Sequence, residues 1–144
     1  MKLVILGLVF VSMLEPMAGD TDREYLECQY RVYNQQYFDN KLPEPKIDTR
    51  LNNLYEAQTV CNTDGNNCSI SFNLHYVAAR RTAQGTLLHE MCHIKTWTKH
   101  LNSSLLPPSA DSEFYHDKSW RGCMLQLDVQ GAFRVINIDF YREE

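Results

Sequence analysis

The 144-residue chain lacks three features that would each indicate a particular class of protein. It has no excess of basic residues, because 14 lysines and arginines stand against 18 aspartates and glutamates, giving a formal net charge of −4. The basic surface typical of nucleic-acid-binding proteins is therefore not expected. It has no apolar run long enough to cross a bilayer, since Leu3–Leu14 falls well short of the roughly 20 residues that a spanning helix needs. It has no internal repeat or Pro/Ser-rich linker, which predicts a single domain.

The N-terminal segment does carry the pattern of a secretory signal peptide. Lys2 precedes the apolar run, and small residues follow it near Ala18. A short positive start, an apolar stretch of this length and a small-residue end are typical of a cleaved signal. We therefore expect a signal peptide over 1–19, a mature domain over 20–144, a secreted or periplasmic location and no stable membrane anchor after cleavage. The alternative is an uncleaved anchor or a buried N-terminal helix.

Export would place the five cysteines in an oxidising compartment, where disulfides form. Cys61 and Cys68 flank a turn-rich stretch that contains an Asp-Gly dipeptide. Strands on both sides would bring these two sulfur atoms together across a hairpin, so a Cys61–Cys68 disulfide is expected. Cys28 could then reach Cys92 or Cys123, and the odd count of five leaves at least one cysteine unpaired unless it bonds another chain. No two cysteines have the CxxC spacing that marks four-cysteine zinc sites.

The residue pattern predicts an α+β fold. Apolar residues alternate with polar ones over 69–74, which is typical of a half-buried strand, and two long segments without proline suit helices. The predicted helices are 20–38, 82–100 and about 113–130, the predicted strands are 46–51, 56–61, 69–74 and 133–141, and 101–112 is predicted to be a loop.

The most informative segment, Thr86–Ile94, contains His89, Glu90 and His93 in the HExxH pattern. On a helix, a spacing of four brings the two histidines within about 40° of each other. Two imidazoles on one face can bind one Zn²⁺, with the intervening glutamate near the open position of the metal. The opposite face is apolar and is expected to pack on the core; it consists of Leu87, Met91, Ile94 and Thr98.

A catalytic zinc ion usually takes three protein ligands and keeps one position for water. His100 shares the helix face but lies roughly 10 Å along the axis from His93, too far for both to bind one ion. His116 lies where a following helix could cross the first, and we favour it as the third ligand. Glu113 and Asp117 are the carboxylate alternatives.

Four segments in this order resemble the SprT-like zinc metallopeptidase domain: Tyr33–Pro43, Ser69–Leu74, Thr86–His93 and His116–Arg121. The resemblance covers about residues 25–130, with Asp117 standing where the family usually has glycine. It implies a zincin-like single domain, in which a small antiparallel or mixed sheet packs on an N-terminal helix, the HExxH helix and a following helix. It also implies that His89, His93 and His116 bind Zn²⁺ and that Glu90 is the catalytic base.

The sequence therefore predicts an exported zinc metalloendopeptidase that hydrolyses peptide bonds by zinc-activated water, with Glu90 as general base. Its expected partner is a protein or peptide substrate, aligned by backbone pairing along strand 69–74 at the edge of the cleft. Nucleic acid is not expected as a partner, and no oligomeric state is predicted. The two alternatives are a secreted module in which zinc is only a structural staple, and a DNA-associated SprT-type protease.

Overall fold

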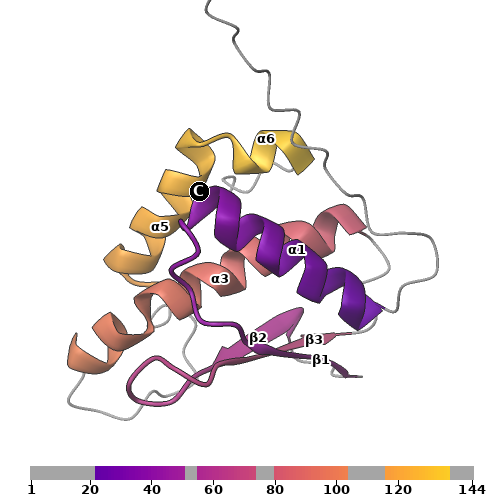
Figure 1. Ribbon diagram of the computed structural model, residues 1–144. Helices are drawn as coiled ribbons and strands as arrows, with labels where there is room; N and C mark the ends of the chain where they lie inside the picture. The colour runs from indigo at the N-terminus through magenta and orange to yellow at the C-terminus, as the bar shows by residue number, and fades with distance from the viewer. Residues whose placement is uncertain (1–21, 51–54, 74–79, 104–115, 137–144) are drawn as a thin grey trace, which may run out of the picture.

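Helices lie on one side of a small sheet (Figure 1). The computed structural model describes residues 22–50, 55–73, 80–103 and 116–136, and the predicted signal peptide lies outside these ranges. Helices α1 and α3 lie next to the sheet, while α5 and α6 pack against α3. The predicted α+β class is confirmed. The helices are α1 (Asp22–Tyr37), α3 (Arg80–Ser103), α5 (Lys118–Val129) and α6 (Ala132–Ile136), and the strands are β1 (Lys46–Arg50), β2 (Ala57–Val60) and β3 (Ser69–Asn73).

The sheet is mixed, and β3 is its central strand. It pairs in parallel with β1 and antiparallel with β2, so that Ile70 lies between Ile47 and Thr59. Ile70 and Phe72 are buried, as the predicted alternation requires. The central position of β3 contradicts the expectation that this segment forms the edge of the cleft. The strand that packs on α3 is β2, and no other described strand pairs with its outer side.

Helix α1 is tied to the start of the sheet through the segment that follows it. The Asn34 side chain donates to the main-chain oxygen of Leu42 at 2.9 Å and accepts from the Leu42 amide at 3.2 Å. The Tyr30 hydroxyl donates to the main-chain oxygen of Pro43. These bonds satisfy backbone groups that have no ladder partner. They give a structural reason for a tyrosine and an asparagine at these two positions of α1.

Helix α3 begins two residues before the predicted boundary, and residues 101–103, predicted to be loop, belong to it. The rest of that predicted loop lies outside the described residues. Helix α5 begins at Lys118, so His116 precedes the helix instead of lying within it. The reason is the N-cap, since the Asp117 side chain accepts from the amides of Ser119 and Trp120. An aspartate at this position ends the preceding segment and starts the helix.

The prediction of a strand over 133–141 is wrong for its described part. Residues 133–136 belong to α6, and residues 137–141 lie outside the described ranges. Gly131, with φ of 81°, turns the chain between α5 and α6. Ala132, Phe133 and Ile136 are then buried together, which is the spacing of a helix face. Packing of this face near α3 outweighs the β-type alternation of the sequence.

Two disulfides are present. The Cys61–Cys68 bond closes the β2–β3 hairpin as predicted, with a Cα–Cα distance of 4.0 Å. The predicted pairing of Cys28 is wrong, because Cys92 bonds to Cys123 and Cys28 carries a free thiol. Helices α3 and α5 pack side by side, which places the Cα atoms of Cys92 and Cys123 5.7 Å apart, within normal disulfide reach.

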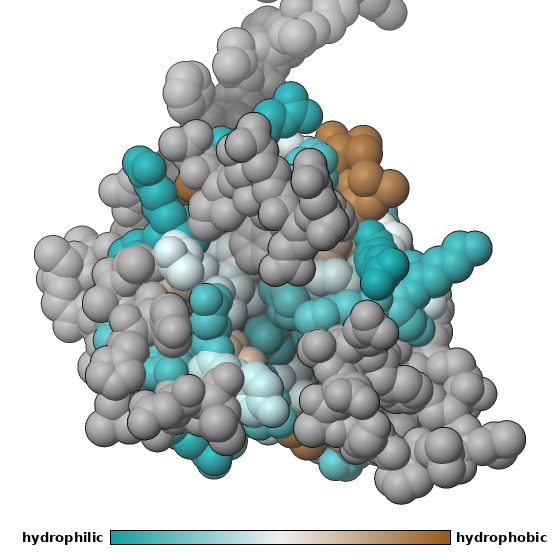
Figure 2. Space-filling view, turned by 180° about the vertical axis from the view of Figure 1, so that it is seen from behind, coloured by the Kyte–Doolittle hydropathy of each residue, from teal (hydrophilic) through white to brown (hydrophobic). Residues whose placement is uncertain are grey.

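The described surface is mainly hydrophilic on the face turned away from the view of Figure 1, with a hollow near its middle and one compact hydrophobic cluster near the upper right edge (Figure 2). Within the described ranges, no helix combines the length and apolar character that a membrane span requires.

Candidate metal centre

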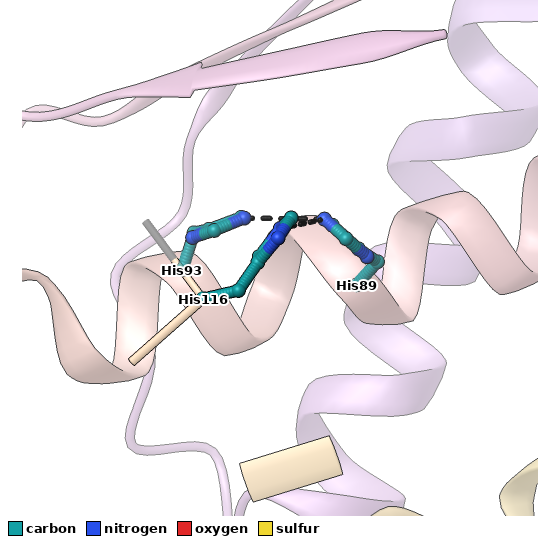
Figure 3. A group of neighbouring side chains, drawn as sticks. All are labelled: His89, His93 and His116. Carbon is teal, nitrogen blue, oxygen red and sulfur yellow. Dashed lines mark hydrogen bonds between the residues drawn. The ribbon is translucent and has the colours of Figure 1, made fainter. Parts of the chain in front are cut away.

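Three imidazole rings converge between α3 and the segment that leads into α5 (Figure 3). The Nε2 atom of His89 lies 3.2 Å from Nε2 of His93 and 3.1 Å from Nε2 of His116. One ring nitrogen from each residue falls within 4.8 Å of the other two. In the described part of the chain, these three histidines form the only group of histidine, cysteine and carboxylate side chains with this arrangement.

The two histidines of α3 are held by the burial of the opposite helix face. Leu87, Met91 and Ile94 are all buried, as the sequence predicts, so the helix cannot rotate about its axis without exposing them. His89 and His93, one turn apart, then point together away from that face. The side chain of Thr98, predicted on the buried face, lies outside the described residues.

The third histidine is brought in by α5. Asp117 caps this helix directly after His116, so the candidate carboxylate ligand has another role and stays outside the imidazole group. Residue Glu113, the other carboxylate alternative, and the side chain of His100 lie outside the described residues. The Cys92–Cys123 disulfide joins α3 to α5 at a residue that lies within the HExxH segment itself. This bond holds α5 beside α3, and His116, which directly precedes the N-cap of α5, therefore stays close to His89 and His93.

Trp120 forms an aromatic wall behind all three imidazoles. Its ring centroid lies 4.2 Å from that of His116, 4.6 Å from that of His89 and 5.6 Å from that of His93, where the rings stack. The indole N–H also donates to the main-chain oxygen of His89 at 3.4 Å. The sequence marks Trp120 only as part of the segment that resembles the family. Its position in the first turn of α5, four residues after His116, is the signal that places it close to that ring.

Glu90 lies on the side of α3 that faces β2 and is 4% exposed. The hydroxyl of Thr59 donates to Glu90 Oε2 at 2.6 Å. Burial raises the pKa of Glu90 to about 7, against the opposing effect of the Thr59 hydrogen bonds. Thr59 was not a candidate from the sequence, since a threonine in a short strand carries no spacing that would relate it to a helix thirty residues away.

The imidazole group suits a tetrahedrally coordinated metal ion. Zn–N bonds of about 2.0–2.1 Å and tetrahedral angles would separate neighbouring nitrogens by roughly 3.3 Å, close to the two observed distances of 3.2 and 3.1 Å. Burial, together with the neighbouring His116, lowers the pKa of His89 to about 3, so this imidazole stays neutral at ordinary pH. A neutral imidazole with an unshared electron pair is the form that binds metal.

The sequence profile of the SprT-like family matches residues 26–141. The chain belongs to the SprT-like family. No curated protein matches the chain. Membership of the SprT-like family associates the chain with a metal-dependent, metallopeptidase-like domain, and the three histidines are the described residues that could hold the metal.

We expect the SprT-like domain to bind one divalent metal ion, and the His116→Ala variant to bind it at least about 100-fold more weakly. Loss of groups that merely support a ligand costs about 10- to 100-fold in affinity, and His116 would be a ligand itself. Competition with a chromophoric chelator measures the affinity. The control is His100→Ala, which removes a histidine from the same helix. Equal affinities for the native chain and His116→Ala would contradict a three-histidine site.

Removal of the Cys92–Cys123 disulfide should weaken both the fold and the metal centre. Replacing both residues by serine is expected to lower the free energy of unfolding by about 3–4 kcal/mol, because the cross-link closes a loop of roughly 30 residues. The metal affinity should fall about 10- to 100-fold, because α5 then holds His116 less firmly. The matched control replaces Cys61 and Cys68 by serine, which removes the other disulfide and should leave the metal affinity unchanged. Chemical denaturation and chelator competition measure the two effects.

Proposed function

We propose that this SprT-like chain is an exported zinc metallopeptidase in which His89, His93 and His116 hold the metal and Glu90 is the general base. The observation that carries the proposal is the convergence of the three imidazoles beside a buried glutamate on the same helix. A structural metal site alone needs the histidines but not the glutamate. The buried Glu90, next in sequence to one histidine, favours catalysis.

Zinc is the metal that we propose for the three-histidine set, since imidazole nitrogen suits it and three protein ligands leave one tetrahedral position open. When bound, the ion would polarise the scissile carbonyl and make water more acidic. Neutral His89, His93 and His116 would provide the ligand atoms. Trp120, packed against all three rings, would keep them in place and keep bulk water from their outer side.

Glu90 would accept a proton from the attacking water and pass it to the leaving amine. A carboxyl group performs both transfers best when its pKa is close to the working pH, and burial raises the pKa of Glu90 to about 7 in the chain without metal. Its carboxylate lies on the β2 side of α3, while the imidazoles converge with the segment before α5. Substrate would therefore approach between β2 and the metal centre.

The outer edge of β2, with which no described strand pairs, would align an extended peptide. The Asn73 amide donates to the main-chain oxygen of Glu56, which identifies Glu56 and Asn73 as a hydrogen-bonded antiparallel pair. Such pairs alternate along the ladder, so the backbone groups of Ala57 and Thr59 face away from β3. These groups could pair with substrate in the role first assigned to strand 69–74. The partner that we propose is accordingly a protein or peptide.

Two disulfides in the described residues are compatible with an oxidising compartment. Together with the signal-peptide pattern of residues 1–19, they support a secreted or periplasmic location. The net charge of −4 favours protein over nucleic acid as the partner.

Glu90→Gln should retain the metal and lose catalysis. The amide keeps the volume of the side chain but cannot accept the proton, and general-base help is worth roughly 10²- to 10⁴-fold in rate. The experiment is cleavage of casein by the zinc-loaded residues 20–144 of the native sequence and of Glu90→Gln, with metal content measured for both.

The results separate the three candidate functions. Cleavage by the native chain alone supports the proposed peptidase. Equal cleavage by both chains would contradict the role of Glu90. A metal-loaded native chain without activity favours the zinc-stapled module. Cleavage that appears only when single-stranded DNA is added favours the DNA-associated protease.

A further inference from the structure

Beyond the metal ligands and the base, we propose that Thr59 of β2 is a positioning residue that orients the Glu90 carboxylate for proton transfer. The proposal rests on the proposed peptidase activity. Thr59 would act through Glu90 and would not touch the reacting atoms itself. It adds to the site a residue from the sheet, which the HExxH pattern does not contain.

The contact is short and buried, and it involves one of the two carboxylate oxygens of Glu90. Thr59 Oγ1 lies 2.6 Å from Glu90 Oε2 and 3.5 Å from the main-chain oxygen of Glu90. Thr59 is 8% exposed and Glu90 is 4% exposed. Among the described residues, Thr59 is the only one that hydrogen-bonds to this carboxylate. Oε2 is thus held by Thr59, and Oε1 is the oxygen that would accept the proton from water.

The flexibility of glutamate makes such a contact necessary. A glutamate side chain has three rotatable bonds, whereas proton transfer requires the acceptor atom within hydrogen-bond reach of the water. Threonine is branched at Cβ and has few rotamers, and Thr59 belongs to a strand whose register is set by its pairing with Ile70. The bond therefore holds the carboxylate in a fixed position relative to the sheet. A hydrogen bond from a hydroxyl to a carboxylate is also stronger than a hydrogen bond between two neutral groups.

A second contact at the same interface provides a matched comparison. One turn earlier on α3, the Thr86 hydroxyl donates to Glu56 Oε2 at 3.3 Å. Here the threonine comes from the helix and the glutamate from the segment leading into β2, the reverse of the Thr59–Glu90 pair. Thr86 is buried as well. A variant at Thr86 thus removes a threonine–glutamate bond between α3 and the exposed Glu56, directly before β2, without touching Glu90.

The experiment compares Thr59→Val, Thr59→Ser and Thr86→Val in the zinc-loaded chain. Valine keeps the shape of threonine and lacks the hydroxyl, whereas serine keeps the hydroxyl. We expect Thr59→Val to lower kcat about 10-fold or more while KM changes less than about 2-fold. The reason is that the loss of the hydroxyl misplaces the base but leaves substrate binding unchanged. Thr59→Ser should recover at least about half of kcat, and Thr86→Val should keep kcat within about 2-fold. Metal content and melting temperature are measured for each variant.

The outcomes distinguish this proposal from the proposed peptidase. Native-like kcat in Thr59→Val, or a Thr59→Ser variant as slow as Thr59→Val, would overturn the positioning role while the peptidase stands. An equal loss of kcat in Thr86→Val would also overturn it, because the effect would then come from the interface as a whole. A metal-loaded native chain that cleaves no substrate would overturn the peptidase and this role with it.

A measurement without turnover tests the contact directly. In the native chain, proton NMR should find the Thr59 hydroxyl proton in slow exchange with water, because it is buried and bonded to a carboxylate. In Glu90→Ala the same proton should exchange rapidly. Rapid exchange in the native chain would overturn the proposal, even if Thr59→Val did not fold.

Discussion

Three imidazole nitrogens can converge on one point only if the helix that carries two of them is fixed against the segment that carries the third. In this chain the contact between α3 and α5 meets that requirement. Its apolar part buries Met124 and Leu127, and its covalent part is the Cys92–Cys123 disulfide. Its polar part is the bond from the Trp120 indole to the backbone of His89. Each of these ties the HExxH helix to α5, so the candidate metal centre is a consequence of how the two helices pack.

The same helix is held from its other side by the sheet. The reciprocal bonds of Thr59 with Glu90 and of Thr86 with Glu56 connect β2 to successive turns of α3. Glu90, which is buried, would be costly to hold there without a hydrogen-bonding partner, whereas Glu56 is exposed. The register of β2 on β3 therefore affects the position of Glu90, a residue that the sequence pattern relates only to the helix. Helix α3 thus lies between two supports, one for the histidines and one for Glu90.

The sequence predicted the parts of this arrangement that depend on local periodicity. The HExxH helix, the alternation of Ile70 and Phe72, and the hairpin closed by Cys61 and Cys68 all follow from spacing along a short segment. The remaining features depend on tertiary contacts. The partner of Cys92 depends on which helix packs beside α3, and the helical state of 133–136 depends on the buried surface available there. The central place of β3 depends on a parallel pairing with β1, which a run of alternating residues does not encode.

Because the two supports of α3 are separate, the position of the histidine group and the position of Glu90 are set independently in this fold. The α5 side determines where the third imidazole lies, and the β2 side determines where the Glu90 carboxylate lies. A change in one support need not alter the other, since the contacts lie on different faces of the helix. Three converging histidines alone are therefore not sufficient to make an SprT-like chain a peptidase. In the function proposed for this chain, the buried Glu90 and the Thr59 hydroxyl bonded to it are the features that a metal staple would not need.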